Sequence, residues 1–252
     1  MKLKSFIRKL ALIALLFIFI FFFPCKIIYS QLKPFAKLQN LEALKSGNER
    51  FIVGKLQQKN FTADRADLLS SQSPYAIIVT CSDSRVVPEY IFDEDFGKLF
   101  VIRIAGNAMS PEALGSVEFA ATYFKCKMLI IMGHENCGAM ITAFEGKSDS
   151  PNINAIRNYL RPAVNYAKSN GHEEKEQINL AIEENVKQQI RNAMDNSQII
   201  RKLTDEGNLT IFGAVYSIST GKVDFLNYSY NPIVKTKNQE RPKNENKHRS
   251  RR

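Results

Sequence analysis

Residues 75–85 read YAIIVTCSDSR and residues 127–137 read KMLIIMGHENC, and in both stretches an apolar run ends in residues that can bind a metal ion. Continuous apolar runs of this length are typical of strands that are buried on both faces of a parallel sheet. The carboxyl ends of parallel strands meet at one edge of such a sheet, where ligands usually bind. We therefore expect two buried strands that bring their terminal residues together.

The residues at these strand ends have the chemistry of zinc ligands. Cys81 follows the first run, and His134 and Cys137 follow the second. Catalytic zinc sites use three protein ligands and keep the fourth tetrahedral position for water or substrate. A lone cysteine is more often a small buried residue than a ligand. The placement of all three residues directly after predicted strands favours a catalytic zinc site.

Asp83 and Arg85 lie two residues apart just after Cys81, so their side chains can point to the same side of the chain. A carboxylate beside a zinc-bound water needs a cation that orients it, and the planar guanidinium of arginine is suited to this. The alternative is an ordinary surface ion pair, which would be worth little. The position of the pair inside a ligand motif favours a role in the site.

The sequence also resembles the β-class carbonic anhydrases from about residue 37 to about residue 228. The resemblance implies that Cys81, His134 and Cys137 bind one Zn²⁺ per subunit. Asp83 would accept a hydrogen bond from the zinc-bound water or, in a closed state, occupy the fourth zinc position, and Arg85 would draw it away from the metal. The segments that carry the resemblance, besides the two motifs, are residues 44–51, 100–107, 115–120, 133–139 and 209–223.

The activity implied by the resemblance is the reversible hydration of carbon dioxide to bicarbonate and a proton by zinc-bound hydroxide. Zinc can lower the pKa of a bound water from about 15.7 to about 7, which provides hydroxide at neutral pH. Val86 and Val87 are candidates for an apolar CO₂ pocket by proximity alone. Two alternatives remain open: a related zinc hydrolase that acts on CS₂ or COS, and a non-catalytic domain that binds zinc and bicarbonate. The presence of both Asp83 and Arg85 favours an enzyme.

The predicted fold is α/β, with a central, mainly parallel sheet flanked by helices and an extended amino-terminal helical arm. Residues 154–203 are predicted to be helical and residues 208–226 to form two more strands. In the family the amino-terminal helix embraces a neighbouring subunit, so a homodimer or homotetramer is expected. This arm has apolar residues at helical spacing that a monomer would leave partly exposed to water: Phe35, Leu38, Leu41, Leu44 and Phe51.

The positive charge of the chain lies at its two ends. Residues 1–9 contribute four positive charges and residues 235–252 a net six, which together account for the formal net charge of +10. The body is neutral by count, so the composition gives no reason to expect a nucleic-acid partner. We expect a catalytic domain over residues 31–234 and a disordered basic tail over residues 235–252.

Residues 10–23 form an unbroken apolar run that follows a basic start and stops at Pro24. A helix of this length spans about 21 Å, which is short of the roughly 30 Å hydrocarbon core of a membrane. Residues 1–30 therefore favour a signal peptide, and the protein is expected to be exported to the periplasm. The alternative is an uncleaved membrane anchor with the catalytic domain outside the cytoplasm.

Overall fold

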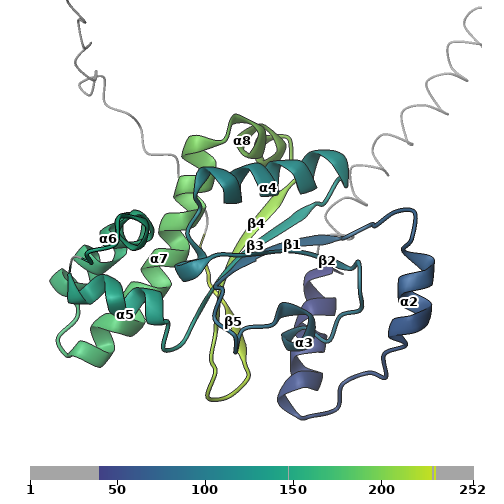
Figure 1. Ribbon diagram of the computed structural model, residues 1–252, viewed down its shortest axis with the longest axis horizontal. Coiled ribbons are helices and arrows are strands. Elements are labelled where there is room, and N and C mark those ends of the chain that lie inside the picture. The colour runs from purple at the N-terminus through teal and green to yellow at the C-terminus, as the bar shows by residue number, and fades with distance from the viewer. Residues whose placement is uncertain (1–39, 147, 229, 231–252) are drawn as a thin grey trace, which may run out of the picture.

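One sheet with the strand order β2-β1-β3-β4-β5 runs through the centre of the computed structural model (Figure 1). The structure describes residues 40–146, 148–228 and 230. In this sheet β2, β1, β3 and β4 run parallel to one another, and β5 runs antiparallel to β4. This confirms the predicted α/β fold. The strands are β1 (Ala76–Thr80), β2 (Leu99–Arg103), β3 (Met128–His134), β4 (Thr210–Tyr216) and β5 (Val223–Phe225).

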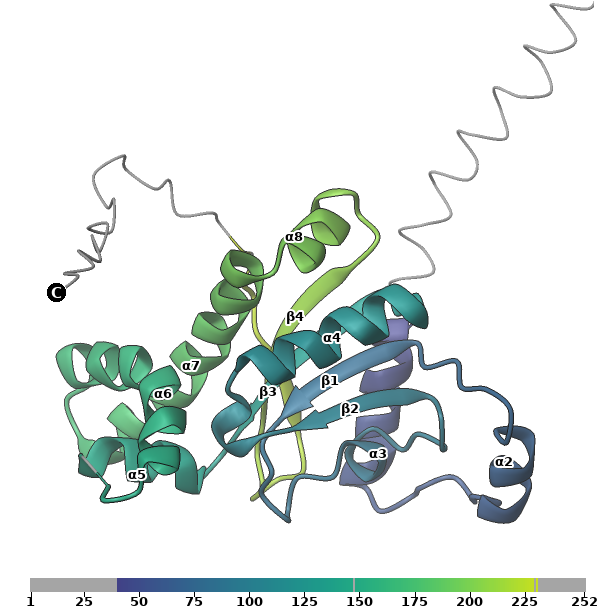
Figure 2. The ribbon, with the colours of Figure 1, turned by 45° about the horizontal axis from the view of Figure 1, so that its top comes forward.

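β1 and β3 are the two strands predicted from their apolar runs, and every residue in both is buried. Successive side chains point to opposite faces of the sheet, so each face needs its own cover. On one face Ile77 and Ile131 pack with residues of helices α4 (Pro111–Tyr123) and α7 (Glu174–Asn196). On the other, Ile78 and Ile130 pack with Leu44 of the helix over residues 40–52. Figures 1 and 2 show α4 lying across one face and the helix over residues 40–52 on the opposite one.

The helices begin where the sequence supplies caps. Ser110 and Ser150 accept backbone hydrogen bonds at the starts of α4 and α6, and each is followed by a proline at the first helical position. The predicted helical stretch over residues 154–203 is confirmed, with breaks near Gly171 and at Ser197. Besides the helix over residues 40–52, the α-helices are α2 (Phe61–Asp67), α3 (Pro88–Ile91), α4 (Pro111–Tyr123), α5 (Gly138–Glu145), α6 (Pro151–Asn170), α7 (Glu174–Asn196) and α8 (Gln198–Asp205). A short 3₁₀ helix, η1, spans Ala105–Asn107.

The helix over residues 40–52 corrects one part of the sequence interpretation. Leu41 is 8% exposed and Leu44 is fully buried, and both pack within the core of their own chain. An apolar stripe shows only that one face of a helix is covered and does not identify what covers it. The expectation that these two leucines would be left wet in a monomer is therefore wrong.

The other predictions at the two ends of the chain concern residues that the structure does not describe. Phe35 and Leu38, the leader over residues 1–30 and the basic tail over residues 235–252 all lie outside the described residues. Among the helices that are described, none is long and apolar enough to cross a membrane.

Asp93 links its own segment, just after α3, to the segment over residues 50–59. Its side chain is fully buried, with Lys59 Nζ at 3.0 Å from Oδ1 and the backbone N–H of Gln57 donating to Oδ2 at 3.1 Å. Arg50 Nε also donates to this carboxylate. Burial would raise the pKa of Asp93, but Arg50, Lys59 and the N–H of Gln57 outweigh it and hold that pKa below its ordinary value. The carboxylate thereby joins the helix over residues 40–52 to the segment after α3.

We expect Asp93→Asn to lower the free energy of unfolding by about 2 kcal/mol at pH 7, less than the 3–5 kcal/mol of a fully buried pair because both cations are partly exposed. The native pKa is depressed, so this stabilisation is complete above the unfolded-state pKa of about 3.9 and is lost as pH falls through the native value. Urea titrations between pH 7 and pH 3 measure the difference. The control is Asp95→Asn, because Asp95 is 42% exposed and pairs with the same Lys59. Equal effects of the two substitutions at pH 7 would contradict this assignment.

Candidate metal centre

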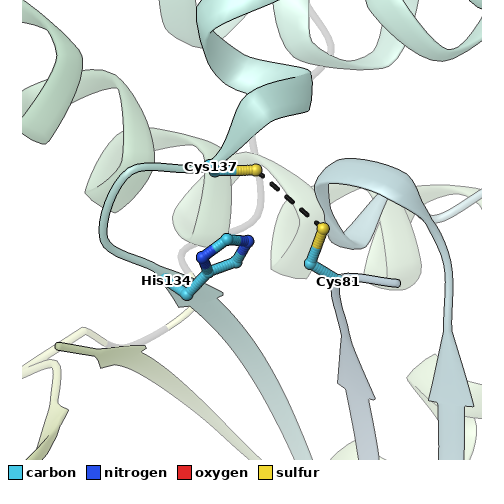
Figure 3. A group of neighbouring side chains, drawn as sticks. All are labelled: Cys81, His134 and Cys137. Carbon is cyan, nitrogen blue, oxygen red and sulfur yellow. Dashed lines mark hydrogen bonds between the residues drawn. The ribbon is translucent and has the colours of Figure 1, made fainter. Parts of the chain in front are cut away.

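The three predicted ligands meet at the carboxyl edge of the sheet (Figure 3). Cys81 follows β1, His134 is the last residue of β3, and Cys137 is the residue that precedes α5. Their ligand atoms all lie within 4.8 Å of one another, and the two sulfurs are 4.0 Å apart. All three residues are buried. The structure therefore brings Cys81 together with two side chains that lie more than 50 residues later in the sequence.

His134 has one ring nitrogen occupied and the other available. Its Nδ1 lies 2.8 Å from the backbone carbonyl of Glu135, and because a carbonyl can only accept, Nδ1 carries the proton. Nε2 then carries a lone pair, and this buried atom has no hydrogen-bond partner among the described residues. Buried polar atoms are nearly always paired. A lone pair that faces two thiols fits a zinc ion, which prefers nitrogen and sulfur ligands in tetrahedral geometry.

The surroundings of the two cysteines favour a thiolate. The pKa of Cys81 is lowered to about 4, mainly by the hydrogen bond with the Cys137 thiol and further by the N–H of Gly106. Gly106 N lies 3.3 Å from Cys81 Sγ. The pKa of Cys137 is raised because it shares a proton with Cys81 and is buried. Zinc binds thiolates, so the arrangement is prepared for a cation that would take the place of the shared proton.

Asp83 is held at the rim of the site by Arg85. Arg85 Nε donates to Oδ1 at 2.9 Å and Nη2 donates to Oδ2 at 2.8 Å, while the backbone N–H of Arg85 donates to Oδ1 at 3.0 Å. These bonds hold the pKa of Asp83 well below its usual range. Oδ2 remains 3.9 Å from Nε2 of His134. This is the arrangement expected of an open site, with the carboxylate near the ligands and bound to arginine.

Arg103 is a functional residue that sequence reasoning missed. It ends β2, and its guanidinium donates to the backbone carbonyls of Cys81, Ser82 and Asp83, at 3.4, 3.3 and 2.6 Å. One side chain therefore fixes the loop that carries both a ligand and the carboxylate. Its position at the carboxyl end of β2, the neighbour of β1 in the sheet, places it beside this loop, and no local pattern in the sequence indicated that contact.

The apolar side of the site comes from helices α5, α6 and α7. Met140, Leu160 and Ile182 pack with the two cysteines in one cluster. Val86, a candidate for the apolar pocket by proximity, is instead buried in the cluster under the opposite face of the sheet. That candidate is wrong, because Val86 packs in this other cluster and not among the residues that pack with the two cysteines.

Solved structures share this fold. A β-carbonic anhydrase of Coccomyxa in complex with acetazolamide superposes with a TM-score of 0.59 at 28% identity, over 66% of this chain and 77% of that one. Tetrameric β-carbonic anhydrases of Sordaria macrospora give a TM-score of 0.58 at 21% identity, over 81% of this chain and 98% of theirs, which shows the common fold. The α/β fold and the Cys81, His134 and Cys137 ligand set together define an α/β enzyme of the β-carbonic anhydrase class.

The sequence comparisons lead to the same class. A sequence model of the carbonic anhydrase family matches residues 76–223. Carbonic anhydrase 2 of Mycobacterium tuberculosis is 32% identical over 186 residues, which cover 72% of this chain and 88% of the relative. Carbonic anhydrase of Pseudomonas aeruginosa is 34% identical over 169 residues, 63% of this chain and 76% of the relative. The chain belongs to the β-class carbonic anhydrase family and is an enzyme of that family.

The distance between the two ligand sulfurs predicts how the metal-free protein responds to oxidation. They are 4.0 Å apart, about twice the length of a disulfide bond, so a small movement can join them. We expect metal-free protein that lacks the leader, and so has the three thiols of Cys81, Cys126 and Cys137, to lose two of them to a mild oxidant and to recover metal binding only after reduction. Bound zinc should protect both thiols. Thiol titration under denaturing conditions and peptide mapping measure the link.

Cys126 provides the internal control for that experiment. It is buried, it donates to the carbonyl of Pro74 at 3.0 Å, and burial raises the pKa of its thiol to about 11. Cys126→Ser should therefore leave the oxidation unchanged. An oxidant-treated, metal-free protein that keeps all three thiols would contradict the prediction.

Proposed function

We propose that this enzyme catalyses the reversible hydration of carbon dioxide to bicarbonate and a proton, with one Zn²⁺ per subunit held by Cys81, His134 and Cys137. The observation that carries the proposal is the buried, unpartnered Nε2 of His134 beside two thiols. Membership of the carbonic anhydrase family supports both the reaction and the metal.

Zinc bound in such a site lowers the pKa of a coordinated water to about 7 and so supplies a nucleophile at neutral pH. Asp83 presents an ionised carboxylate 3.9 Å from the free nitrogen of His134, within reach of a molecule bound at the centre. Its Oδ2 can accept a hydrogen bond and thereby orient the nucleophile. Arg85 keeps the carboxylate charged and in place, since it binds both oxygens.

The apolar cluster beside the ligands suits the substrate. Carbon dioxide carries no net charge and no hydrogen-bond donor, so it enters a dry pocket more readily than an ion does. Met140, Leu160 and Ile182 are each no more than 3% exposed and provide such a wall. The bicarbonate product is charged and is expected to leave by way of the rim, where the side chain of Arg85 is 49% exposed.

The decisive experiment is stopped-flow CO₂ hydration combined with metal analysis on the same preparations. We expect Cys81→Ser and His134→Ala to lose both zinc and activity, because each removes a metal ligand. Asp83→Asn should keep zinc and lose about 10- to 100-fold in turnover, because it removes only the orienting charge. Cys126→Ser is the matched thiol control and should retain both properties.

Each unexpected result has a distinct meaning. Stoichiometric zinc in Cys81→Ser would overturn the ligand assignment. Zinc-loaded wild-type protein that hydrolyses CS₂ or COS but not CO₂ would establish the alternative hydrolase. Protein that binds zinc and bicarbonate without turnover would establish a non-catalytic domain.

We also propose that the enzyme is a homodimer or homotetramer. β2 is an edge strand of the described sheet, and beside it Phe119 and Tyr123 of α4 are 45% and 72% exposed. These rings cluster with Phe100 and Phe124. An exposed apolar patch beside the free edge of a sheet is a surface that a second copy of the chain can cover.

Light scattering tests this assembly. The double substitution Phe119→Ser and Tyr123→Ser should reduce the molar mass to that of a monomer, because it removes most of the exposed aromatic surface. Tyr166→Ser is the matched control, since Tyr166 is similarly exposed but lies on α6. A wild-type monomer at micromolar concentration would overturn the proposal.

Export to the periplasm, with residues 1–30 as a cleaved leader, is proposed from the sequence of that segment. The alternative is retention as a membrane anchor. Amino-terminal sequencing of the mature protein distinguishes the two.

A further inference from the structure

Two buried amide side chains lie on the inner face of α7, where the neighbouring residues are apolar. Asn185 is 2% exposed and Gln189 is fully buried. Side chains of this kind are rarely buried without hydrogen bonds, because each unpaired amide group loses its contact with water. The apolar residues that share this face with them are Ile182, Val186, Ile190 and Ala193.

The two amides form a hydrogen-bond ladder from α7 to the segment over residues 106–109. The backbone N–H of Met109 donates to Gln189 Oε1 at 2.9 Å, and Gln189 Nε2 donates to Asn185 Oδ1 at 2.9 Å. Asn185 Nδ2 then donates to the carbonyl of Gly106 at 3.0 Å and to Asn107 Oδ1 at 3.3 Å. A backbone N–H can only donate and a carbonyl can only accept, so the two ends of the ladder fix the orientation of both amides.

The ladder ends at the residue that touches a ligand sulfur. Gly106, whose carbonyl accepts from Asn185, donates its own N–H to Cys81 Sγ at 3.3 Å. Gly106 has φ +64 and Asn107 has φ +45, the left-handed region that non-glycine residues seldom adopt. Glycine rotates more freely than any other residue, so the direction of its N–H depends on what holds the groups around it.

Close packing also restricts the position of the segment over residues 106–109. A Cβ added to Gly106 would lie 2.8 Å from Cδ1 of Leu160, which belongs to α6, so this helix packs closely against the turn. On the other side, Asn192 Nδ2 of α7 donates to the carbonyl of Met109 at 3.0 Å. Packing sets the location of the turn, and the amides set the direction of its polar groups.

We propose that Asn185 and Gln189 are positioning residues for Cys81. They hold the N–H of Gly106 against the sulfur, although neither touches a ligand. An N–H bond to a metal-bound thiolate reduces the charge that sulfur donates and leaves the metal more electrophilic, as hydrogen bonds around metal ligands generally do. The inference rests on the proposed zinc site and adds to it the groups that tune one of its sulfurs.

The test uses cobalt(II) in place of zinc, because sulfur-to-cobalt charge transfer gives an absorption band that reports on the thiolates. Asn185→Leu keeps the approximate size of the side chain and removes the donor to Gly106. We expect the band to move to lower energy, because a thiolate without its N–H is more electron-rich. Zinc affinity, measured by competition with a chelator, should still fall about 10-fold, because Cys81 loses part of the hydrogen-bonded support that holds it in position for the metal.

Ile190→Ala is the matched control. Ile190 is 2% exposed on the same helix, so its loss weakens packing without touching the ladder. Its band position and zinc affinity should match those of the wild type while its thermal stability falls. An unshifted band in Asn185→Leu, or equal shifts in both variants, would show that the amides merely stabilise the fold.

A second variant covers the case in which Asn185→Leu does not fold. Gln189→Met retains Asn185 but removes the acceptor of Met109 N–H, and a smaller shift in the same direction is expected. An unshifted band in folded Gln189→Met would overturn the ladder. Wild-type protein without a sulfur-to-cobalt band would instead overturn the metal site on which the ladder depends, a result that the variants cannot imitate.

Discussion

The pairing of β1 with β3 is the constraint on which the metal centre depends. In the observed register Thr80 lies opposite Met132, which places Cys81 and His134 at the same edge of the sheet. A slip by one residue would turn the side chains of one strand to the opposite face. A slip by two would move one ligand about 7 Å along the strand, too far for one metal ion to bind both. The continuous apolar burial of the two strands therefore fixes the positions of the ligands.

Helix α7 approaches this pair of strands closely because two glycines make room for it. A Cβ on Gly133 would lie 3.0 Å from Val186, and one on Gly213 would lie 2.8 Å from the same valine. Gly133 directly precedes the ligand His134. The close approach brings the inner face of α7 to the metal centre, so that one face of this helix both fills the core and carries the amides that reach Gly106.

The sequence predicted the strands and the meeting of the three candidate ligands because these signals are local. The apolar runs over residues 75–80 and 127–132 identify buried strands, and the residues after them have metal-binding chemistry. Arg103, Asn185 and Gln189 could not be found in this way. Each acts on backbone groups that lie far away in the sequence and come near only in the folded chain.

The interpretation of the apolar stripe was wrong at Leu41 and Leu44 for a related reason. Helical spacing shows that one face of a helix is covered but does not identify what covers it. For Leu41 and Leu44 the cover is the sheet of their own chain. The aromatic residues of α4 fit an interface better because their exposure is observed directly in the fold.

Charge balance explains why the chain surrounds its ligands with donors. Two thiolates neutralise the charge of a zinc ion, so they weaken the attraction of the metal for electrons more than imidazoles would. Gly106 donates an N–H to Cys81, and the backbone N–H groups of Ala139 and Met140 partly offset the rise in the pKa of Cys137 that Cys81 and burial cause. These donors draw charge away from both sulfurs. A site with two thiolates can then keep an electrophilic metal, provided that the backbone donors stay in place.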